Sequence, residues 1–292
     1  MTLILDGKKV REGKTAILRK TIADLGGDLT LAILQVGHSE ASDAYISQKK
    51  NFAEKVGVKV SHHVFPDNVE EREITDIVND LNRRQEVHGI IVQLPIPERL
   101  DKEKILNTID ARKDIDGLGD INFKKLSLKD KSGHVPATAR GILELLSFYG
   151  VGISGKKVAV LGRSKLVGAP VARLLENEGA IVSVCHSKTE NVPEITKQSD
   201  IIVVAIGKPR FVGEGFFRND KTQTVVDVGI TAVTEEGAEK LEEEIPKRTL
   251  VGDVDFERVK DMVFAISPVP GGVGPMTVLC LFENLANAYG MK

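Results

Sequence analysis

Short apolar runs alternate with helical segments along almost the whole chain, and this alternation constrains the fold more than any other feature of the sequence. The runs that predict strands occupy residues 30–36, 58–65, 88–94, 156–161, 180–185, 201–205, 224–228 and 263–266. Helices are predicted at 41–56, 69–84, 101–109, 139–149 and 167–178, with a last one beginning near Pro275. Strands separated by helices of this length predict parallel strands joined by right-handed crossovers, so the expected fold class is α/β.

The chain is long enough for about two domains, since it has 292 residues. The segment GHVPATAR at 133–140 interrupts two periodic regions and predicts a domain boundary near residue 140. Because no long Gly/Ser linker separates the halves, we expect them to be rigidly joined around a cleft, a preferred place for ligands.

Composition excludes several functional classes. The 40 basic and 42 acidic residues give a formal charge of −2, so nothing predicts a nucleic-acid or anionic membrane partner. Apolar runs such as 201–206 are too short to span a membrane. Two cysteines, Cys185 and Cys280, are too few for a disulfide framework; we expect both to be buried and the protein to be cytoplasmic. The acidic stretch 235–244 predicts only a solvated helix face.

A glycine-bearing turn follows the predicted strand at 156–161. The sequence KKVAVLGRSKLVG runs into Gly162, and Gly168 opens the next helix. Glycine lets the backbone approach a phosphate, and the N–H groups of a helix N-terminus point at such an anion. The spacing matches neither GxGxxG nor the P-loop pattern, and a tight turn without a ligand explains it about as well. This turn alone leaves nucleotide binding open.

The end of the next strand indicates which nucleotide would bind. Roughly twenty residues after the glycine turn, NAD enzymes carry an acidic residue for the ribose hydroxyls, whereas this chain reads CHSKT at 185–189. Arg163, Ser187 and Lys188 are donors suited to a 2′-phosphate, which favours NADP over NAD. The alternative is that the two cations are simply exposed. Glycines at two further strand ends, Gly207 and Gly229, support a dinucleotide across the sheet edge.

Four polar residues of the first half occupy positions where a cleft is expected. Tyr45 and Lys49 lie four apart on a predicted helix, Gln93 ends an apolar strand, and Asp116 precedes a glycine turn. Each has a plain structural explanation, as packing, a surface cation, a strand-end cap or a turn former. No metal site is expected, because adjacent His62 and His63 point to opposite faces of a strand.

Together, these segments resemble the bifunctional methylenetetrahydrofolate dehydrogenase/methenyltetrahydrofolate cyclohydrolase family over nearly the whole chain. The most specific is SPVPGGVGPMT at 267–277, which is hard to generate by chance. The others, in family order, are VGHSEASDAYISQKK (36–50), GIIVQLPIP (89–97), KDIDG (113–117), GRSKLVGAP (162–170), CHSKT (185–189), AIGKP (205–209), DVGI (227–230) and VGDV (251–254).

The resemblance implies two α/β domains and a homodimer. Residues 1–139 with 270–292 would form a folate-binding catalytic domain, and 140–269 a Rossmann-type NADP-binding domain with a mainly parallel sheet. The implied chemistry is NADP-dependent oxidation of 5,10-methylenetetrahydrofolate to 5,10-methenyltetrahydrofolate, followed by hydrolysis to 10-formyltetrahydrofolate.

The resemblance also implies the site residues. In the catalytic site, Lys49 would handle protons, Gln93 would hold it, Tyr45 would orient it, and Asp116 would accept hydrogen bonds from the pterin. The loop Pro270-Gly271-Gly272 would line the folate end of the cleft. The cofactor-binding positions are matched by Gly162, Arg163, Ser164, Ser187 and Ile230.

The chain departs from the family pattern in two places. The family's His-Pro pair after the KDxDG turn is missing, since Gly119-Asp120 precede Ile121-Asn122 here, and this leaves the loop geometry near Asp116 open. The family's PCTP reads Pro136-Ala137-Thr138-Ala139. Because the missing cysteine is not a conventional nucleophile in this reaction, we expect activity to survive.

Three other functions compete with the bifunctional enzyme. A dehydrogenase without the hydrolase step is disfavoured because both Lys49 and Gln93 are present. An NADP-dependent oxidoreductase that acts on a shikimate-like or amino-acid substrate would share the two-domain plan. That function does not explain the PGGVGPMT segment, which is more specific to the folate family. A non-catalytic nucleotide-binding module would not need the four polar residues.

Overall fold

The computed structural model describes residues 1–234 and 248–290, so the predicted helix face at 235–244 lies outside the described residues. The chain forms two compact units. Residues 1–10 with 142–276 make the six-stranded unit, and residues 11–141 with 277–292 make the three-stranded unit. No helix in the described part of the chain combines the length and apolar character that crossing a membrane requires.

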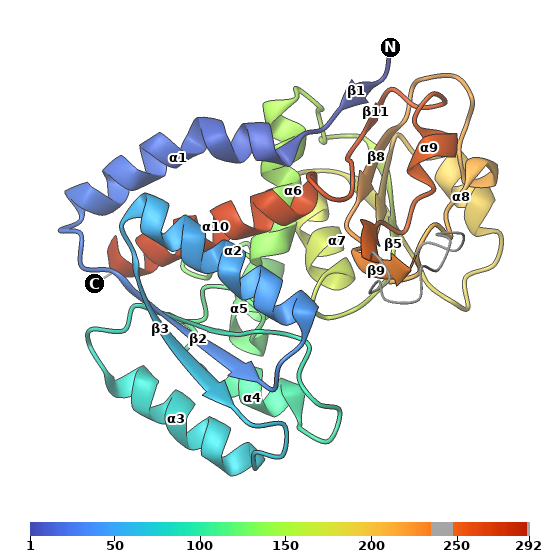
Figure 1. Cartoon of the computed structure of the whole chain (residues 1–292). Helices are drawn as coiled ribbons and strands as arrows, with labels where there is room; N and C mark the ends of the chain where they lie inside the picture. The colour runs from blue at the N-terminus through green and yellow to red at the C-terminus, as the bar shows by residue number, and fades with distance from the viewer. Residues whose placement is uncertain (235–247, 291–292) are drawn as a thin grey trace, which may run out of the picture. The chain divides into compact units, whose positions relative to one another are not determined.

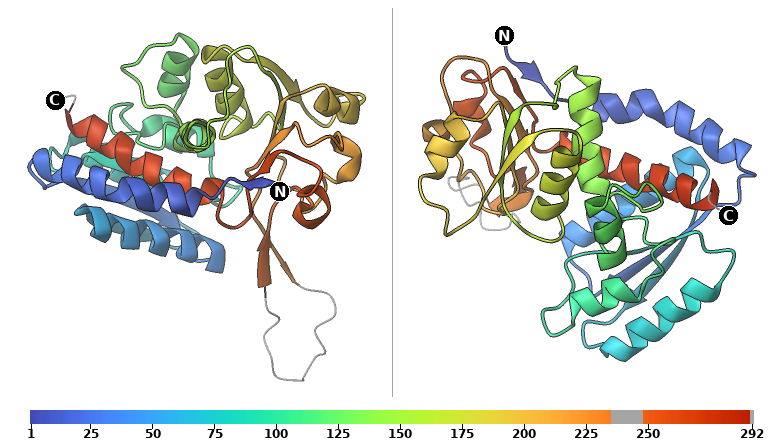
Figure 2. Two further views of the ribbon diagram at one scale, coloured as in Figure 1. Left: turned by 90° about the horizontal axis from the view of Figure 1, so that it is seen from above. Right: turned by 180° about the vertical axis from the view of Figure 1, so that it is seen from behind.

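The three-stranded unit is built on a parallel sheet in the order β3-β2-β4. The central strand is almost wholly buried, because helices lie on both sides of it: α2 on one side of the sheet and α3 on the other (Figures 1 and 2). The elements are β2 (Thr30–Val36), α2 (Glu40–Val56), β3 (Lys59–Phe65), α3 (Glu71–Arg83), β4 (Gly89–Val92), α4 (Lys102–Thr108) and α5 (Asp120–Ser127).

Two long helices complete this unit from the ends of the chain. Most of α1 (Gly7–Asp24) and of α10 (Val273–Gly290) belongs to it, and both lie beside α2 (Figure 2). The rings of Phe52 on α2 and Phe282 on α10 meet edge to face at 5.3 Å, and the Arg11 guanidinium lies over Phe52. The last helix therefore packs into the core of the three-stranded unit.

The six-stranded unit contains a parallel sheet in the order β1-β11-β8-β7-β5-β6. The order in which the chain adds strands to the sheet reverses at β5: the next strand, β6, pairs with one side of β5, and β7 pairs with its other side. In doubly wound sheets, ligands bind at the carboxyl ends of strands at such a point. The elements are β1 (Leu3–Ile4), α6 (Ala137–Phe148), β5 (Lys157–Leu161), α7 (Gly168–Asn177), β6 (Ile181–Cys185), α8 (Val192–Lys197), β7 (Ile201–Val204), a 3-10 helix (Glu214–Phe216), β8 (Thr224–Asp227), β9 (Thr231–Thr234), β10 (Arg248–Val251), α9 (Phe256–Val259) and β11 (Ala265–Ile266).

The α/β class and the parallel pairing of the main strands are confirmed. Helix α1 was not predicted, because its apolar residues are sparse: Val10, Leu18 and Ile22 are buried among charged neighbours. Short elements such as β1 and α8 were also missed, since two to six residues carry no measurable period.

Candidate active site

Helix α2 carries the first two candidate residues, Tyr45 and Lys49. The helix begins after Ser39, whose hydroxyl accepts the N–H of Ser42, and ends at Gly57, which has a φ of 82°. Residues four apart share a helix face, so both side chains project in one direction. The Lys49 side chain is buried, with 9% of the residue exposed, and Tyr45 is half-buried.

Gln93 follows the end of β4 and faces the Lys49 amine. Its backbone N–H donates to the carbonyl of Leu34 at 2.8 Å, which extends the pairing of β4 with β2 by one residue. Its side-chain Nε2 donates to the carbonyl of Leu94 at 2.7 Å, so the amide oxygen points the other way. Lys49 Nζ donates to that oxygen, Oε1, at 2.7 Å. The structure thus brings two of the four candidates into direct contact.

The surroundings of Lys49 favour its neutral form. Burial lowers the pKa of the Lys49 ammonium, and the nearby Asp116 carboxylate partly opposes this change. The Gln93 amide oxygen accepts a hydrogen bond without supplying a full negative charge. A lysine held in this way can give and take a proton closer to neutral pH than an exposed one can.

Asp116 lies close enough to Lys49 for their charges to interact. Burial raises the pKa of Asp116 to about 6, while the Lys49 charge lowers it and the Asp114 charge raises it. Tyr45 shares the helix face of Lys49, and burial raises the pKa of its hydroxyl, so it stays protonated. The amine, the amide and this carboxylate therefore form one electrostatic group within the three-stranded unit.

The turn that carries Asp116 is closed around a second carboxylate, that of Asp114. This carboxylate accepts the N–H of Gly117 at 3.1 Å, the N–H of Gly119 at 2.9 Å and Nδ2 of Asn122 at 2.9 Å. Gly117 has a φ of 71°, and a Cβ there would lie 2.8 Å from the backbone nitrogen of Pro136. Glycine is required at this position because both its conformation and its surroundings exclude a side chain.

The two departures from the family pattern fall on this turn, and the structure shows what occupies them. In the absence of the His-Pro pair, Asn122 joins Asp114 to the carbonyl of Ala111 and to the N–H of His134. Ala137 is fully buried, and its N–H donates to the carbonyl of Asp116 at 3.1 Å. The turn that holds Asp116 is therefore fixed by the residues this chain has.

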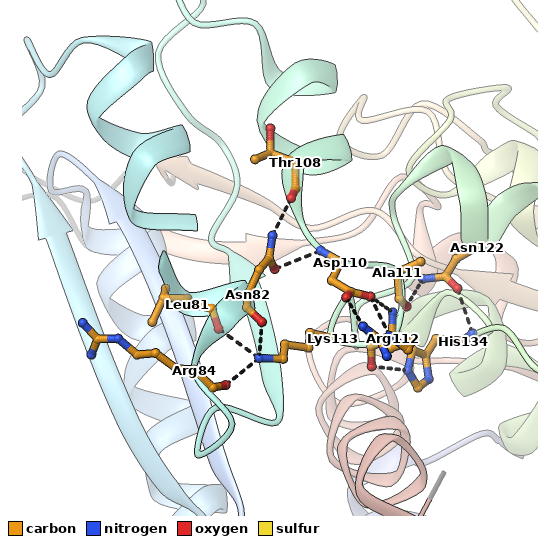
Figure 3. Close-up of polar contacts among 10 residues, drawn as sticks. All are labelled: Leu81, Asn82, Arg84, Thr108, Asp110, Ala111, Arg112, Lys113, Asn122 and His134. Atoms are coloured by element: carbon orange, nitrogen blue, oxygen red, sulfur yellow. Dashed lines mark hydrogen bonds and ion pairs between the residues drawn. The ribbon is translucent and has the colours of Figure 1, made fainter. Parts of the chain in front are cut away.

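A wider polar network anchors the same segment to helix α3, as Figure 3 shows. Lys113 Nζ donates to the carbonyls of Leu81, Asn82 and Arg84 at 3.0, 2.8 and 2.7 Å, which satisfies acceptors at the C-terminal end of the helix (Figure 3). The Asn82 side chain accepts the N–H of Asp110. From the last helix, Asn284 Nδ2 donates to the carbonyl of Ile115, the residue before Asp116. None of these contacts is local in sequence.

The six-stranded unit has a pocket of about 640 Å³ at the carboxyl ends of its central strands. The pocket is lined by residues that follow β5, β6 and β7, which is where the reversal at β5 predicts a ligand. Four of the five candidate cofactor residues line it: Gly162, Arg163, Ser164 and Ser187.

The glycine turn beneath this pocket has the shape of a phosphate-binding turn. Gly162 has a φ of 119°, and a Cβ on it would lie 2.2 Å from the carbonyl oxygen of Ala205. A Cβ on Gly168 would lie 2.2 Å from the carbonyl oxygen of Gly162. Ser164 Oγ accepts the N–H of Val167 at 3.2 Å, which shapes the turn before α7. Only glycines allow strand and helix to approach this closely, so the residues fit a dinucleotide.

Several pocket residues were not predicted. Phe211 and Phe216 line the pocket, and Lys208 Nζ lies 5.2 Å from the Phe211 ring centroid. Phe211 lies in an irregular segment, and Phe216 ends a 3-10 helix of three residues, so neither belongs to an element long enough to show a period. Only the preceding glycine turn indicated that this part of the chain reaches the sheet edge. Lys188, proposed with Ser187 as a phosphate donor, is not among the lining residues.

The remaining candidates lie elsewhere in the six-stranded unit. Ile230 follows β8, outside the lining of the pocket. In the loop at 270–272, Gly271 has a φ of 119°, and its carbonyl accepts the N–H groups of Gly7 and Lys8. The N–H of Gly272 donates to the carbonyl of Pro268 at 2.8 Å. This loop is thereby tied to the start of α1.

Fold and sites together define a class of protein. One unit has a doubly wound parallel sheet with a nucleotide-sized pocket over a glycine turn, and the other has a buried amine suited to proton transfer. This combination is that of a two-domain, nucleotide-dependent enzyme.

Comparison with known proteins identifies the family. Residues 5–116 match the tetrahydrofolate dehydrogenase/cyclohydrolase catalytic domain, and residues 136–292 match the NAD(P)-binding domain of the same family. The chain is 40% identical over 295 residues to the bifunctional protein FolD of Lachnoclostridium phytofermentans, covering 100% of this chain and 99% of that protein.

Two solved structures of family members have the same fold as this chain. The bifunctional FolD dehydrogenase/cyclohydrolase of Campylobacter jejuni has a TM-score of 0.90 and 36% identity, covering 100% of this chain and 99% of that one. The Trypanosoma brucei enzyme, complexed with NADP cofactor and inhibitor, has a TM-score of 0.91 and 34% identity, covering 99% and 98%. The chain belongs to the tetrahydrofolate dehydrogenase/cyclohydrolase family.

Proposed function

We propose that this protein oxidises 5,10-methylenetetrahydrofolate to the 5,10-methenyl form with NADP⁺ and then hydrolyses the product to 10-formyltetrahydrofolate. Membership of the family makes the chain a bifunctional dehydrogenase and cyclohydrolase. The observation that carries the residue assignment is the buried Lys49 amine, hydrogen-bonded to Gln93 at 2.7 Å and influenced by Asp116.

In the oxidation, the protein mainly positions the reactants. When bound, NADP⁺ would supply the acceptor for the hydride of the methylene carbon, while the substrate's own nitrogens stabilise the methenyl cation. Asp116 is the proposed acceptor for pterin N–H groups, a role that requires its carboxylate form and weakens below about pH 6, where it takes up a proton. Pro270, Gly271 and Gly272 are proposed to line the folate site.

In the hydrolysis, Lys49 is the proposed proton carrier. As the oxygen of a water molecule bonds to the amidinium carbon, the neutral amine accepts a proton from that water. The carbon–nitrogen bond of the ring then breaks as the formyl carbonyl forms. The proton held by Lys49 passes to the nitrogen that leaves, and the remaining hydroxyl proton is released to solvent. A nearby substrate cation adds to burial in favouring the neutral amine. Gln93 holds the amine in place, and Tyr45 packs against it.

Replacing Lys49 tests this assignment. We expect Lys49→Met to reduce the rate of hydrolysis by at least about 100-fold, because proton transfer by a positioned group contributes on this scale. Dehydrogenase activity should fall less, since that step needs no proton carrier. The absorbance of the methenyl product measures both activities, first by its formation and then by its decay.

Lys50→Met is the matched control, because Lys50 is an exposed lysine on the same helix that contacts His62. It should leave both activities close to those of the unsubstituted protein. Full hydrolysis by a folded Lys49→Met variant would refute the role assigned to Lys49.

NADP is the proposed cofactor rather than NAD. Arg163 and Ser187 line the pocket after β5 and β6, and none of the lining residues that the structure describes is acidic and could bind free ribose hydroxyls. The NADP complex of the Trypanosoma brucei relative supports the same choice. Ile230, from its position after β8, is proposed to contact the cofactor beyond this pocket.

Arg163→Ala tests cofactor choice. We expect the KM for NADP⁺ to rise about tenfold and that for NAD⁺ to change little, because only NADP⁺ loses a charge-assisted contact. Arg173→Ala on α7 is the control, since Arg173 lies outside the pocket lining and pairs with Glu176. Equal effects on the two nucleotides would contradict a 2′-phosphate contact.

A homodimer is proposed to form through the edge strand β6. This strand ends the six-stranded sheet, and its Ile181 and Val184 are 61% and 40% exposed. An uncharged, largely apolar edge favours pairing with a second copy, whereas β3, an edge strand of the three-stranded sheet, carries Lys59 and two histidines.

Sedimentation checks this arrangement. The unsubstituted protein should sediment at twice the mass of one chain, and Val184→Lys should shift it toward the monomer because a lysine there breaks the apolar edge. Val64→Lys places the same residue on β3 and should leave the dimer intact. A dimer unaffected by Val184→Lys would exclude this edge.

The remaining assignments are also proposals. A cytoplasmic location is supported by the two buried cysteines, Cys185 and Cys280, which form no disulfide with each other. Residues 1–139 with 270–292 are proposed as the folate-binding catalytic domain and 140–269 as the NADP-binding domain. Support comes from the family match at 5–116 and from the packing of α10 in the three-stranded unit, although the compact units assign residues 1–10 and 270–276 to the six-stranded unit and the second family match runs from 136 to 292.

A further inference from the structure

Two buried carboxylates lie beside the nucleotide pocket and have no part in the chemistry above. Asp227 ends β8 and is 3% exposed, and Asp253, in the segment after β10, is fully buried. Burying one carboxylate is unfavourable unless hydrogen bonds compensate, and burying two near each other is more so. We therefore asked which parts of the backbone the two carboxylates hold in place.

Asp253 binds the backbone that forms part of the pocket wall. Its Oδ2 accepts the N–H of Ile206 at 2.7 Å and that of Gly207 at 2.9 Å, directly after β7. Ala205, Ile206 and Lys208 all line the pocket. The carboxylate therefore fixes the path of the chain where β7 meets the ligand site.

Asp227 in turn fixes the segment that carries Asp253. Its Oδ1 accepts the N–H of Gly229 at 3.0 Å and that of Asp253 at 3.1 Å, and its Oδ2 accepts the N–H of Val254 at 2.9 Å. The two side chains thus connect the ends of β7 and β8 with the segment after β10. The same contacts hold the backbone just before Ile230.

Two glycines make this close packing possible. A Cβ on Gly252 would lie 1.9 Å from Oδ2 of Asp227, and a Cβ on Gly229 would lie 2.2 Å from Cγ of Asp253. Neither contact is sterically allowed, so each carboxylate packs against a position that only glycine can occupy. The pair is therefore built into the backbone of this sheet edge.

The charges of the pair are incompletely compensated. Burial raises the pKa of Asp227 to about 7, and the nearby Asp253 charge contributes to this increase. Within the part of the chain that the structure describes, Oδ1 of Asp253 is buried without a hydrogen-bond partner. A contact maintained at this cost in stability is more readily explained by a function than by folding alone.

We propose that Asp253, held by Asp227, is a positioning residue for the nucleotide: it sets the Ile206–Gly207 backbone in the conformation that the bound cofactor requires. This inference rests on the proposed function only in assigning the pocket to a nucleotide. Asp253 acts through the backbone, without touching the reacting atoms.

Asp253→Ala tests the proposal through cofactor kinetics. Two N–H groups lose their acceptor, so the loop moves, and we expect the KM for NADP⁺ to rise about tenfold or more. At saturating NADP⁺ the dehydrogenase kcat should stay within about threefold, because the reacting groups are untouched. Hydrolysis of methenyltetrahydrofolate without nucleotide should be unchanged. A merely structural role would lower kcat together with the circular dichroism of the folded protein.

Gly229→Ala provides a second variant in case Asp253→Ala fails to fold. The added methyl group displaces the Asp253 carboxylate without removing the residue or its ability to ionise. The KM for NADP⁺ should therefore rise in this variant too. Asp255→Asn is the matched control, two residues away, because Asp255 pairs with Arg258 and makes no contact with the 206–207 backbone. It should leave the KM unchanged.

Fluorescence of bound NADPH separates the possible failures. If the unsubstituted protein does not bind NADPH, both the nucleotide assignment and the positioning role are wrong. If it binds NADPH and the Asp253→Ala or Gly229→Ala variant, whichever folds, binds equally well, the positioning role alone is overturned. A selective loss of NADPH affinity in the folded variants, with Asp255→Asn unaffected, supports it.

Discussion

The account depends on one interaction: a lysine amine removed from water and hydrogen-bonded to an amide oxygen instead of a carboxylate. The Lys49–Gln93 bond of 2.7 Å is buried between a helix and the end of a strand. A direct ion pair would have fixed the proton on the amine, whereas an amide partner satisfies one N–H and leaves the proton removable. Asp116 is close enough to moderate the change without reversing it.

The two units use the same construction for different chemistry. In each, a parallel sheet delivers polar groups at the carboxyl ends of its strands, and buried carboxylates brace the loops there through backbone N–H groups. Asp114 closes the turn that carries Asp116, and Asp253 holds the backbone after β7. Glycines at 117, 229 and 252 permit these carboxylates and turns to approach the backbone.

The sequence could predict the parallel α/β fold and the residues at strand ends, because period and turn chemistry are local properties. Tyr45 and Lys49 follow from helical spacing, and Gly162 from the strand–turn–helix pattern. Nothing local predicts that Gln93 meets Lys49 across 44 residues, or that Asn284 binds the carbonyl of Ile115 from the last helix. In the sequence, Asp253 is distinguished only by its place in the VGDV segment, because its contacts with residues 206 and 207 exist only in the folded sheet.

The most direct measurement of the central claim is the titration of the Lys49 amine by nitrogen-15 NMR of its Nζ. A lysine in this environment should lose its proton below the ordinary value of 10.5, because burial disfavours the charged form. Since the pKa of Lys49 is lowered in the folded state, the free energy of unfolding should decrease as the pH falls from 10.5 toward the folded pKa, because over this range the unfolded chain takes up a proton that the folded chain does not. A Lys49 amine that titrates with the exposed lysines, at or above 10.5, would contradict the account.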